Sequence, residues 1–437
     1  MEWPLALLLI FGSLGVLMLS GLPISFCFML VNVMGAYLFW GGGIGLEQLA
    51  FSIFRSVSRF SLIALPLFIL MGEIMFRTEV APKMMDTLDK WLGRVPGRLG
   101  LEAVAGGAIF ATLSGSSAAS VAMLGGTLVE EMEKRGYKKP MSLGPILGSG
   151  GLAIMIPPSG LAVLLGAIGE ISIGGILISM IIPGLLMGVF YATYIMVRSW
   201  LDPKLAPSYE VATISVGKKI IATIKYILPL GIVLFLVIGV IFLGVSTPTE
   251  AAALGVIGTL ILAALYRKLN WDNLWKAASS AVRTTGMIFF IIIGAAPFSQ
   301  ILAFSGATPG LINLTTAIAM PPLAIIIIMM VVVIFLGMVM TSSSILMVCL
   351  PLFMPIVRAM GFNDVWFAVI MLLNIEMGMT SPPFGMALFV MKGVAPPNTT
   401  MGDCYRAALP FLACDLVVMI LLISFPKIAL WLPGFMG

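Results

Sequence analysis

The sequence predicts an all-α polytopic membrane protein made of two inverted repeats, each with a re-entrant helical hairpin and a broken helix. Three observations lead to this prediction. Of the 437 residues, 60% are hydrophobic and only 10% are charged, whereas roughly a quarter of a soluble domain is charged. The apolar residues fall into long runs separated by short basic loops. Four short motifs of the first half return in the same order in the second half.

The composition excludes several classes of function. The chain has no histidine, which rules out a histidine-liganded metal, histidine-based catalysis and a histidine proton relay. Its four cysteines have no CxxC spacing, so we interpret them as packing residues. The net charge of +5 does not predict a nucleic-acid partner, because the basic residues lie in short loops between apolar runs. The N-terminus lacks a basic leading region and a cleavage site, so we expect a retained first span.

The long apolar runs are the predicted membrane spans, since about 20 apolar residues cross a bilayer as a helix. Two of them, residues 141–170 and 363–394, are interrupted by prolines and are predicted to be broken helices. The other predicted spans are residues 4–20, 24–40, 61–76, 173–197, 226–243, 249–266, 284–304 and 405–425.

Two further apolar stretches, residues 100–129 and 311–357, are each too long for one helix. Each has a polar centre of small residues, SGSS at 114–117 and TSSS at 341–344. A long apolar run with a serine-rich centre predicts a helical hairpin that enters the bilayer and turns back.

Basic residues predict the orientation in the membrane. If five loops are cytoplasmic, they contain 20 of the 24 lysines and arginines, and both chain termini lie outside. Two segments, residues 77–98 and 267–283, mix tryptophan with basic residues and are predicted to be helices in the cytoplasmic interface. The five loops are residues 77–98, 130–140, 198–225, 267–283 and 392–406, and the remaining basic residues are Arg55, Arg59, Arg358 and Lys427.

The repeat has a nearly constant offset. The first-half motifs ALPLF, SGSS, IMIPPSG and IIPGLL return as AAPF, TSSS, MTSPPFG and ALPFLA, about 225 to 231 residues later. The predicted topology starts the first half outside and the second half inside, so the halves are inverted. Inverted repeats with discontinuous helices are typical of secondary transporters.

Each repeat combines a hairpin tip with a proline break. The first pair is residues 112–117 with 149–159, and the second is residues 337–344 with 378–384. Consecutive prolines free upstream carbonyls, which need a partner at membrane depth. Hydroxyl and carbonyl oxygens suit Na⁺, a hard cation. The alternative is a helix kink whose serines bond back to the i−4 carbonyl.

The same tips and breaks leave helix N-termini pointing inward, where unpaired N–H groups attract carboxylates. No lysine or arginine falls inside a tip or break. An anionic substrate would therefore be held by hydroxyls, amides and bound cations. The candidate substrate-binding residues are Ser116, Ser117, Ser159, Ser342 and Ser343.

Two acids within predicted spans are candidates for proton transfer, because intramembrane acids are costly unless they are used. Glu376 lies just before the second break and Asp415 lies in the last span. The alternative for each is a structural hydrogen bond to a neighbouring helix.

Four runs of sequence resemble the large membrane subunit of tripartite ATP-independent periplasmic (TRAP) transporters: LPLFILMGEIM, VPGRLGLEAVAGGAIFATLSGSSAASVAMLG, GSGGLAIMIPPSG and EMGMTSPPFGMALFVMKG. The resemblance extends over the whole chain. It implies an elevator-type transporter of the bacterial cytoplasmic (inner) membrane that imports a small organic acid, usually driven by Na⁺. The implied partners are a small four-helix membrane subunit and a periplasmic substrate-binding protein.

The resemblance also implies two Na⁺ sites. The first consists of Ser114, Gly115, Ser149, Gly150 and Ile156, and the second of Gly337, Thr341, Gly378, Ser381 and Phe384. The second tip departs from the family pattern, because Thr341 or Ser342 stands where an acid is often found. That departure leaves the substrate class open.

We expect a scaffold of residues 1–60, 171–283 and 395–437 around a transport domain of residues 61–170 and 284–394. The nearest alternative is a stand-alone Na⁺- or H⁺-coupled dicarboxylate symporter that needs no binding protein. A channel would need a continuous polar pore, but the polar tips are enclosed by apolar segments. An enzyme is not expected, because no Ser/His, GxGD or HExxH signature is present.

Overall fold

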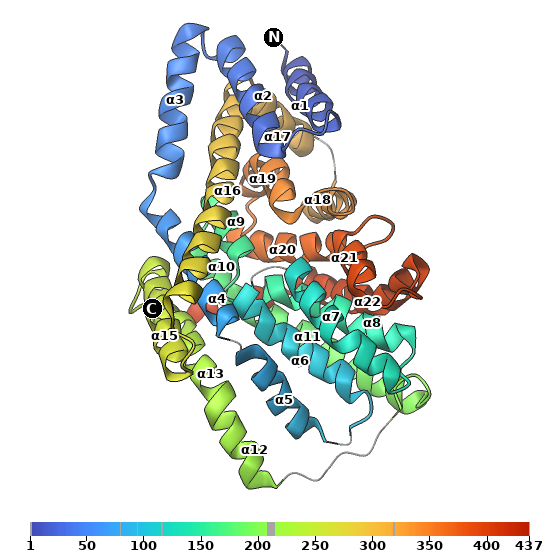
Figure 1. The fold of residues 1–437 in the computed structure, drawn as a ribbon. Helices are drawn as coiled ribbons and strands as arrows, with labels where there is room; N and C mark the ends of the chain where they lie inside the picture. Colours follow the sequence, from blue (N-terminus) through green and yellow to red (C-terminus); the bar gives the residue numbers. More distant parts are fainter. Residues whose placement is uncertain are drawn as a thin grey trace.

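The computed structural model describes residues 2–78, 80–93, 95–114, 117–207, 215–317 and 320–436, and all regular elements in these ranges are helices (Figure 1). Within these ranges, seven helical segments are long and apolar enough to cross a membrane. The bent pair α8 and α9 forms an eighth candidate. The seven segments are Phe60–Arg77, Ile173–Leu201, Val216–Phe242, Pro248–Leu265, Trp271–Phe304, Ser342–Ala359 and Met401–Ser424. The predicted all-α class is confirmed.

The first half begins with α1 (Trp3–Leu19) and α2 (Ile24–Phe39), followed by a helix that the sequence did not predict, α3 (Gly43–Val57). Its buried residues, Gly45, Leu49, Ser52 and Ser56, recur at helical spacing and form one face. This face packs on α2 and α16. Three of the four residues on this face are small or polar, so hydropathy alone did not mark it. A short 3₁₀ turn, η1 (Phe60–Ile63), then leads into α4 (Ala64–Arg77).

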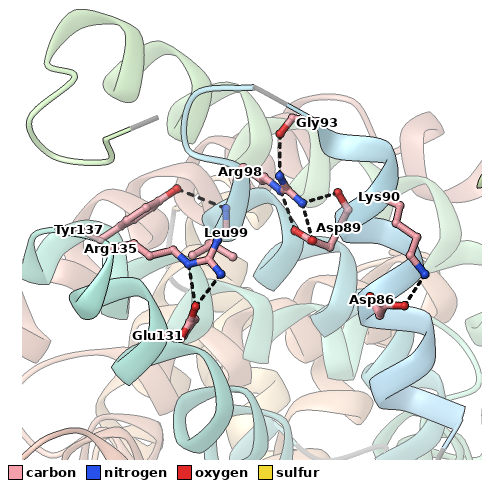
Figure 2. A network of polar contacts seen from close by, with 9 residues as sticks. All are labelled: Asp86, Asp89, Lys90, Gly93, Arg98, Leu99, Glu131, Arg135 and Tyr137. Atoms are coloured by element: carbon pink, nitrogen blue, oxygen red, sulfur yellow. Dashed lines mark hydrogen bonds and ion pairs between the residues drawn. The ribbon is translucent and has the colours of Figure 1, made fainter. Parts of the chain in front are cut away.

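The first hairpin consists of α6 (Arg98–Ser114) and α7 (Ser117–Lys134), preceded by the amphipathic α5 (Val80–Leu92). Figure 2 shows the open end of this hairpin. The buried Arg98 side chain donates to the carboxylate of Asp89 and to the carbonyls of Asp89 and Gly93. The backbone N–H of Leu99 donates to the hydroxyl of Tyr137, 3.4 Å away. These bonds join α6 to α5 and to the segment that follows α7.

Both broken helices have the predicted form. The first consists of α8 (Lys139–Met155) and α9 (Gly160–Gly169), which meet at 44°. The second consists of α20 (Asp364–Thr380) and α21 (Met386–Val394). Each break contains a cis Pro-Pro peptide, at residues 157–158 and 382–383. The prolines explain both interruptions, because a proline removes one backbone donor and clashes with the preceding turn.

Between the two broken helices the chain forms α10 (Ile173–Ser179), α11 (Ile181–Leu201), the segment Val216–Phe242 (α12 to α14, joined by π-helical turns), α15 (Pro248–Leu265) and α16 (Trp271–Phe304). The sequence predicted an interfacial helix at residues 267–283, separate from the next span. The structure instead continues both as the 34-residue α16, capped by the Asn270 side chain. No proline occurs in this helix before Pro297, so nothing stops the helix at the predicted boundary.

The second hairpin is shorter than predicted. It consists of α18 (Pro322–Gly337) and α19 (Ser342–Ala359), whereas the earlier part of the predicted stretch belongs to a separate helix, α17 (Ala307–Ala317). Pro321 and Pro322 set this boundary, because proline favours the first turn of a helix and disfavours its interior. The chain ends with α22 (Met401–Ser424), α23 (Lys427–Leu430) and the 3₁₀ turn η4 (Pro433–Phe435).

The helix contacts of the two halves are reciprocal. Helix α2 packs on α16 and α15 packs on α4, while α7 packs on α21 and α19 packs on α9. The equivalent pairs α4–α16 and α8–α20 also contact each other. A two-fold relation between the halves requires such exchanged pairs. In Figure 1, α18 and α19 lie above α20, and α6 to α8 lie below it. The opposite membrane orientation of the halves stays a prediction.

Helices α11 and α22 lie against the hairpins and broken helices. Helix α22 packs on α8, α20 and α21, and α11 packs on α8 and α6. The division predicted from the sequence assigns both helices to the scaffold. The division into scaffold and transport domain stays a prediction.

Candidate functional site

The first hairpin tip lies against the first broken helix. At Gly107 of α6, an added Cβ would lie 2.3 Å from the Cβ of Ser149, so only glycine permits this approach. At Gly150, an added Cβ would lie 3.0 Å from the hydroxyl oxygen of Ser117. The predicted residues Ser117, Ser149 and Gly150 are therefore neighbours. The Ser149 hydroxyl donates to the carbonyl of Ile146 at 2.8 Å, the back-bonding that the alternative interpretation expects.

The first break itself is closely packed. The predicted ligand Ile156 is half-buried, and its N–H donates to the carbonyl of Leu152 at 2.8 Å. Ser159 is fully buried and caps α9 by accepting a hydrogen bond from the N–H of Ala162 at 3.4 Å. Gly115 and Ser116, and the side chain of Ser114, lie outside the described residues, so their predicted roles stay predictions.

The second hairpin meets the second broken helix backbone to backbone. A Cβ added at Gly337 would lie 2.7 Å from the Cα of Gly378, and the reverse distance is 2.8 Å. Thr341 caps α19, and its hydroxyl lies 2.7 Å from that of Ser344. Ser342 and Ser343 are half-buried in the first turn of the same helix.

The second break resembles the first in its polar groups. The hydroxyl of Ser381 is buried and donates to the carbonyl of Met377 at 2.6 Å. The carbonyl of Pro383 accepts a hydrogen bond from the Tyr405 hydroxyl of α22 at 2.8 Å. The side chain of Phe384 is 61% exposed, so only its backbone is placed to serve a site inside the break.

Sequence reasoning missed one polar residue beside the second pair. Asn374 of α20 is buried, and its amide nitrogen donates to the carbonyl of Met330 in α18. Its carbonyl oxygen has no partner among the described residues. The offset of 225 residues between the two proline breaks relates Asn374 to Ser149. That offset was the available signal, because each break then has a buried side-chain oxygen at the same position.

A buried polar cluster connects the two constellations. The Ser117 hydroxyl donates to Glu376 Oε1 at 2.9 Å, so a predicted substrate ligand contacts the predicted proton carrier. The other carboxylate oxygen of Glu376 has no partner among the described residues. An added Cβ at Gly151 would lie 2.9 Å from Glu376 Cγ and 3.5 Å from the Tyr191 hydroxyl. Tyr191 donates in turn to the buried Asp415.

The hairpin tips, the proline breaks and this cluster form a site of hydroxyl, amide, carbonyl and carboxylate oxygens inside an apolar helical body. The family model of the tripartite ATP-independent periplasmic transporter, DctM component, matches residues 11–428. The chain belongs to this family. It is a multi-pass membrane protein, and the resemblance drawn from the four sequence runs is confirmed.

Curated members of the family are similar to this DctM component over most of its length. The C4-dicarboxylate TRAP transporter large permease protein DctM of Pseudomonas aeruginosa is 30% identical, over 90% of each chain. The ectoine TRAP transporter large permease protein TeaC of Halomonas elongata is 28% identical, over 95% of this chain and 96% of its own. The isethionate TRAP transporter permease protein DctMQ of Oleidesulfovibrio alaskensis is 28% identical, over 97% of this chain and 66% of its own.

The fold of this DctM component is also found in a solved structure. The crystal structure of the Alcanivorax borkumensis YdaH transporter, which has an unusual topology, superposes with a TM-score of 0.63 over 90% of each chain. The two sequences are only 14% identical, so the comparison supports the fold alone.

Proposed function

We propose that this DctM component imports a small organic acid across the bacterial cytoplasmic membrane, coupled to Na⁺, by an elevator movement of its hairpins and broken helices. Its partners are a small four-helix membrane subunit and a periplasmic binding protein that delivers the substrate. The relatives named above are transporters of small organic solutes: C4-dicarboxylates, isethionate and ectoine. The chain's own small anionic substrate belongs to the same broad class.

One observation carries the proposal: each hairpin packs closely against a broken helix at a glycine, Gly107 in the first half and Gly337 in the second. The distances at Gly107 and Gly337 leave no room for a side chain between hairpin and broken helix. At both places, hydroxyl and carbonyl oxygens of the hairpin and the broken helix can approach each other without an intervening positive side chain. Such a set fits Na⁺, a hard cation that prefers oxygen ligands. The unpartnered oxygen of Asn374 supports the second site, because a buried polar atom needs a partner.

The substrate would lie between the two proposed cation sites. Ser117 of the first constellation bonds to Glu376 of the second broken helix, which links the two constellations. Bound Na⁺ near the tips would supply the positive charge that lysine or arginine side chains do not supply there. The substrate carboxylate would then be held by hydroxyls and helix N-termini beside bound Na⁺.

The test is uptake into proteoliposomes that contain both membrane subunits, with the binding protein outside. Replacing Ser381 with alanine removes one proposed oxygen ligand of Na⁺. A lost hydrogen-bond-strength contact to a charge costs about 1.5–3 kcal/mol, or about ten- to a hundredfold in affinity. The half-saturating Na⁺ concentration should rise by that factor.

Ser13→Ala is the matched control, because the Ser13 hydroxyl also donates to a backbone carbonyl but lies in α1. It should leave the Na⁺ dependence unchanged. Uptake by the purified single chain would instead favour the stand-alone symporter. Uptake driven by a proton gradient without Na⁺ would make Glu376 the residue to test.

A further inference from the structure

Two external arginines share one cavity. The topology prediction leaves only four of the 24 basic residues on the outer side, yet Arg55 and Arg59 both line a cavity of about 210 Å³. Basic residues are rare on that side of membrane proteins, so their convergence calls for a function. The other lining residues are Ser52, Ser56, Glu170, Ala296 and Gln300.

The cavity offers hydrogen-bond donors for an anion. Arg55 is exposed and forms no ion pair with any residue that the structure describes. The Ser52 hydroxyl donates to the carbonyl oxygen of Gln300 at 2.8 Å. The amide nitrogen of Gln300 takes no part in this bond and can serve as a donor. A guanidinium group with its fixed fork of donors suits the two oxygens of a carboxylate or sulfonate.

Glu170 forms an ion pair with one of the two arginines, Arg59. Its carboxylate lies 2.5 Å from the guanidinium of Arg59. Glu170 ends α9 with φ 55° and ψ 43°, the left-handed conformation in which glycine is usual. A glutamate is unfavourable there, so its carboxylate is the feature that explains its presence. Arg358 supports this turn by donating to the carbonyl of Gly169 at 2.8 Å.

The same ion pair borders a second cavity. That cavity, of about 550 Å³, is lined by Arg59 and Glu170 together with residues of the α9–α10 turn and of the start of α15. The pair therefore lines both the small cavity and the larger one. Arg59 precedes α4 and belongs to the predicted scaffold, whereas Glu170 follows α9 and belongs to the predicted transport domain. The ion pair therefore joins the two predicted domains.

We propose that the small cavity is an external recognition site for organic anions, in which Arg55 and Arg59 bind a carboxylate or sulfonate that displaces Glu170. This inference rests on the proposed function, since it gives the imported acid a first contact with the membrane subunit. The competing explanation is a structural ion pair that merely holds α9 in place.

The two explanations predict opposite effects of removing Glu170. Glu170→Gln frees Arg59 and should strengthen anion binding, whereas Arg59→Gln should weaken it by about ten- to a hundredfold. A purely structural pair would give both variants the same defect.

The reporter is Ala296→Cys, a small substitution at a half-buried lining residue. The complex of both membrane subunits is reconstituted, and an impermeant, negatively charged methanethiosulfonate is added from outside. We measure how much succinate or isethionate halves the labelling rate. The chain without this substitution gives the background from its four native cysteines. Lys427→Gln, an external basic residue that does not line the cavity, is the matched control.

We expect both anions to protect the cysteine. Arg55→Gln and Arg59→Gln should raise the half-protecting concentration about ten- to a hundredfold, Glu170→Gln should lower it, and Lys427→Gln should leave it unchanged. Absent protection, or a Glu170→Gln variant that behaves like Arg59→Gln, would overturn the inference. Uptake without protection would reject this site and leave the proposed function standing. Protection without uptake would support this site and reject the proposed function.

Discussion

Replacing Gly337 with alanine is the sharpest test of the contact between the second hairpin and its broken helix. The added methyl carbon would lie 2.7 Å from the Cα of Gly378. Two non-bonded carbons are normally about 3.5–4.0 Å apart, so α18 and α20 must separate by about 1 Å. The atoms nearest to the added methyl belong to the backbone of Gly378 and Met379, so no side-chain rotation can relieve the clash. Overpacking of this kind costs about 1–3 kcal/mol.

The separation should also change cation binding, because it moves residues 338–341 away from the second proline break. We expect the half-saturating Na⁺ concentration to rise at least about tenfold, since 1.4 kcal/mol is lost for each factor of ten. Thermal unfolding of the purified protein measures the stability change, and uptake at varied Na⁺ measures the second effect. Gly126→Ala is the matched control, because nothing lies within 4 Å of its added methyl group. If Gly337→Ala matched Gly126→Ala in both assays, the close packing of hairpin and break would be refuted.

Three further predictions concern other parts of the chain. Ser117→Ala removes the hydrogen bond to Glu376 Oε1 and should weaken substrate affinity more than Na⁺ affinity in titrated uptake; an equal or opposite change contradicts this role. Arg98→Gln should destabilise the protein by about 2–3 kcal/mol in thermal unfolding, because the buried guanidinium holds the open end of the first hairpin, whereas the exposed Lys134→Gln should have no measurable effect. Cysteines at Lys138 and Gly361 should label from opposite sides of sealed cells, and labelling of both from outside would reject the inverted topology.

The sequence was most informative where composition changes abruptly. Prolines 157–158 and 382–383 stand out in apolar runs, and both breaks occur where they were predicted. Helix α3 was missed because its buried face contains glycine and serine, which a hydropathy scale does not score as apolar. The extent of α16 was missed because a change from polar to apolar residues does not end a helix; a proline or a cap does.

The candidate site was predictable only in part. The serine-rich tips are visible in the sequence, and Ser117 and Ser149 do lie where the first hairpin contacts the first broken helix. The partner of Ser117 was not predictable, because Glu376 lies 259 residues away and only tertiary packing joins them. The contact between Arg59 and Glu170 was not predictable for the same reason, because the two residues lie 111 positions apart in two different loops. Charge counts placed both residues near span ends without indicating that they meet.

The unbroken length of α16 has a mechanical consequence. At 1.5 Å per residue, its 34 residues extend about 51 Å, whereas the hydrocarbon core of a bilayer is about 30 Å thick. The N-terminal turns, with Asp272 and Lys276, therefore extend beyond the hydrocarbon core. Further along the helix, Ser280 donates to Glu73 of α4 at 2.6 Å. The helix has no proline before Pro297, so a tilt of residues 284–296 also moves Trp275 near its N-terminus. In a chain whose other seven tryptophans are replaced, fluorescence from Trp275 would then report on a tilt of the apolar part of α16.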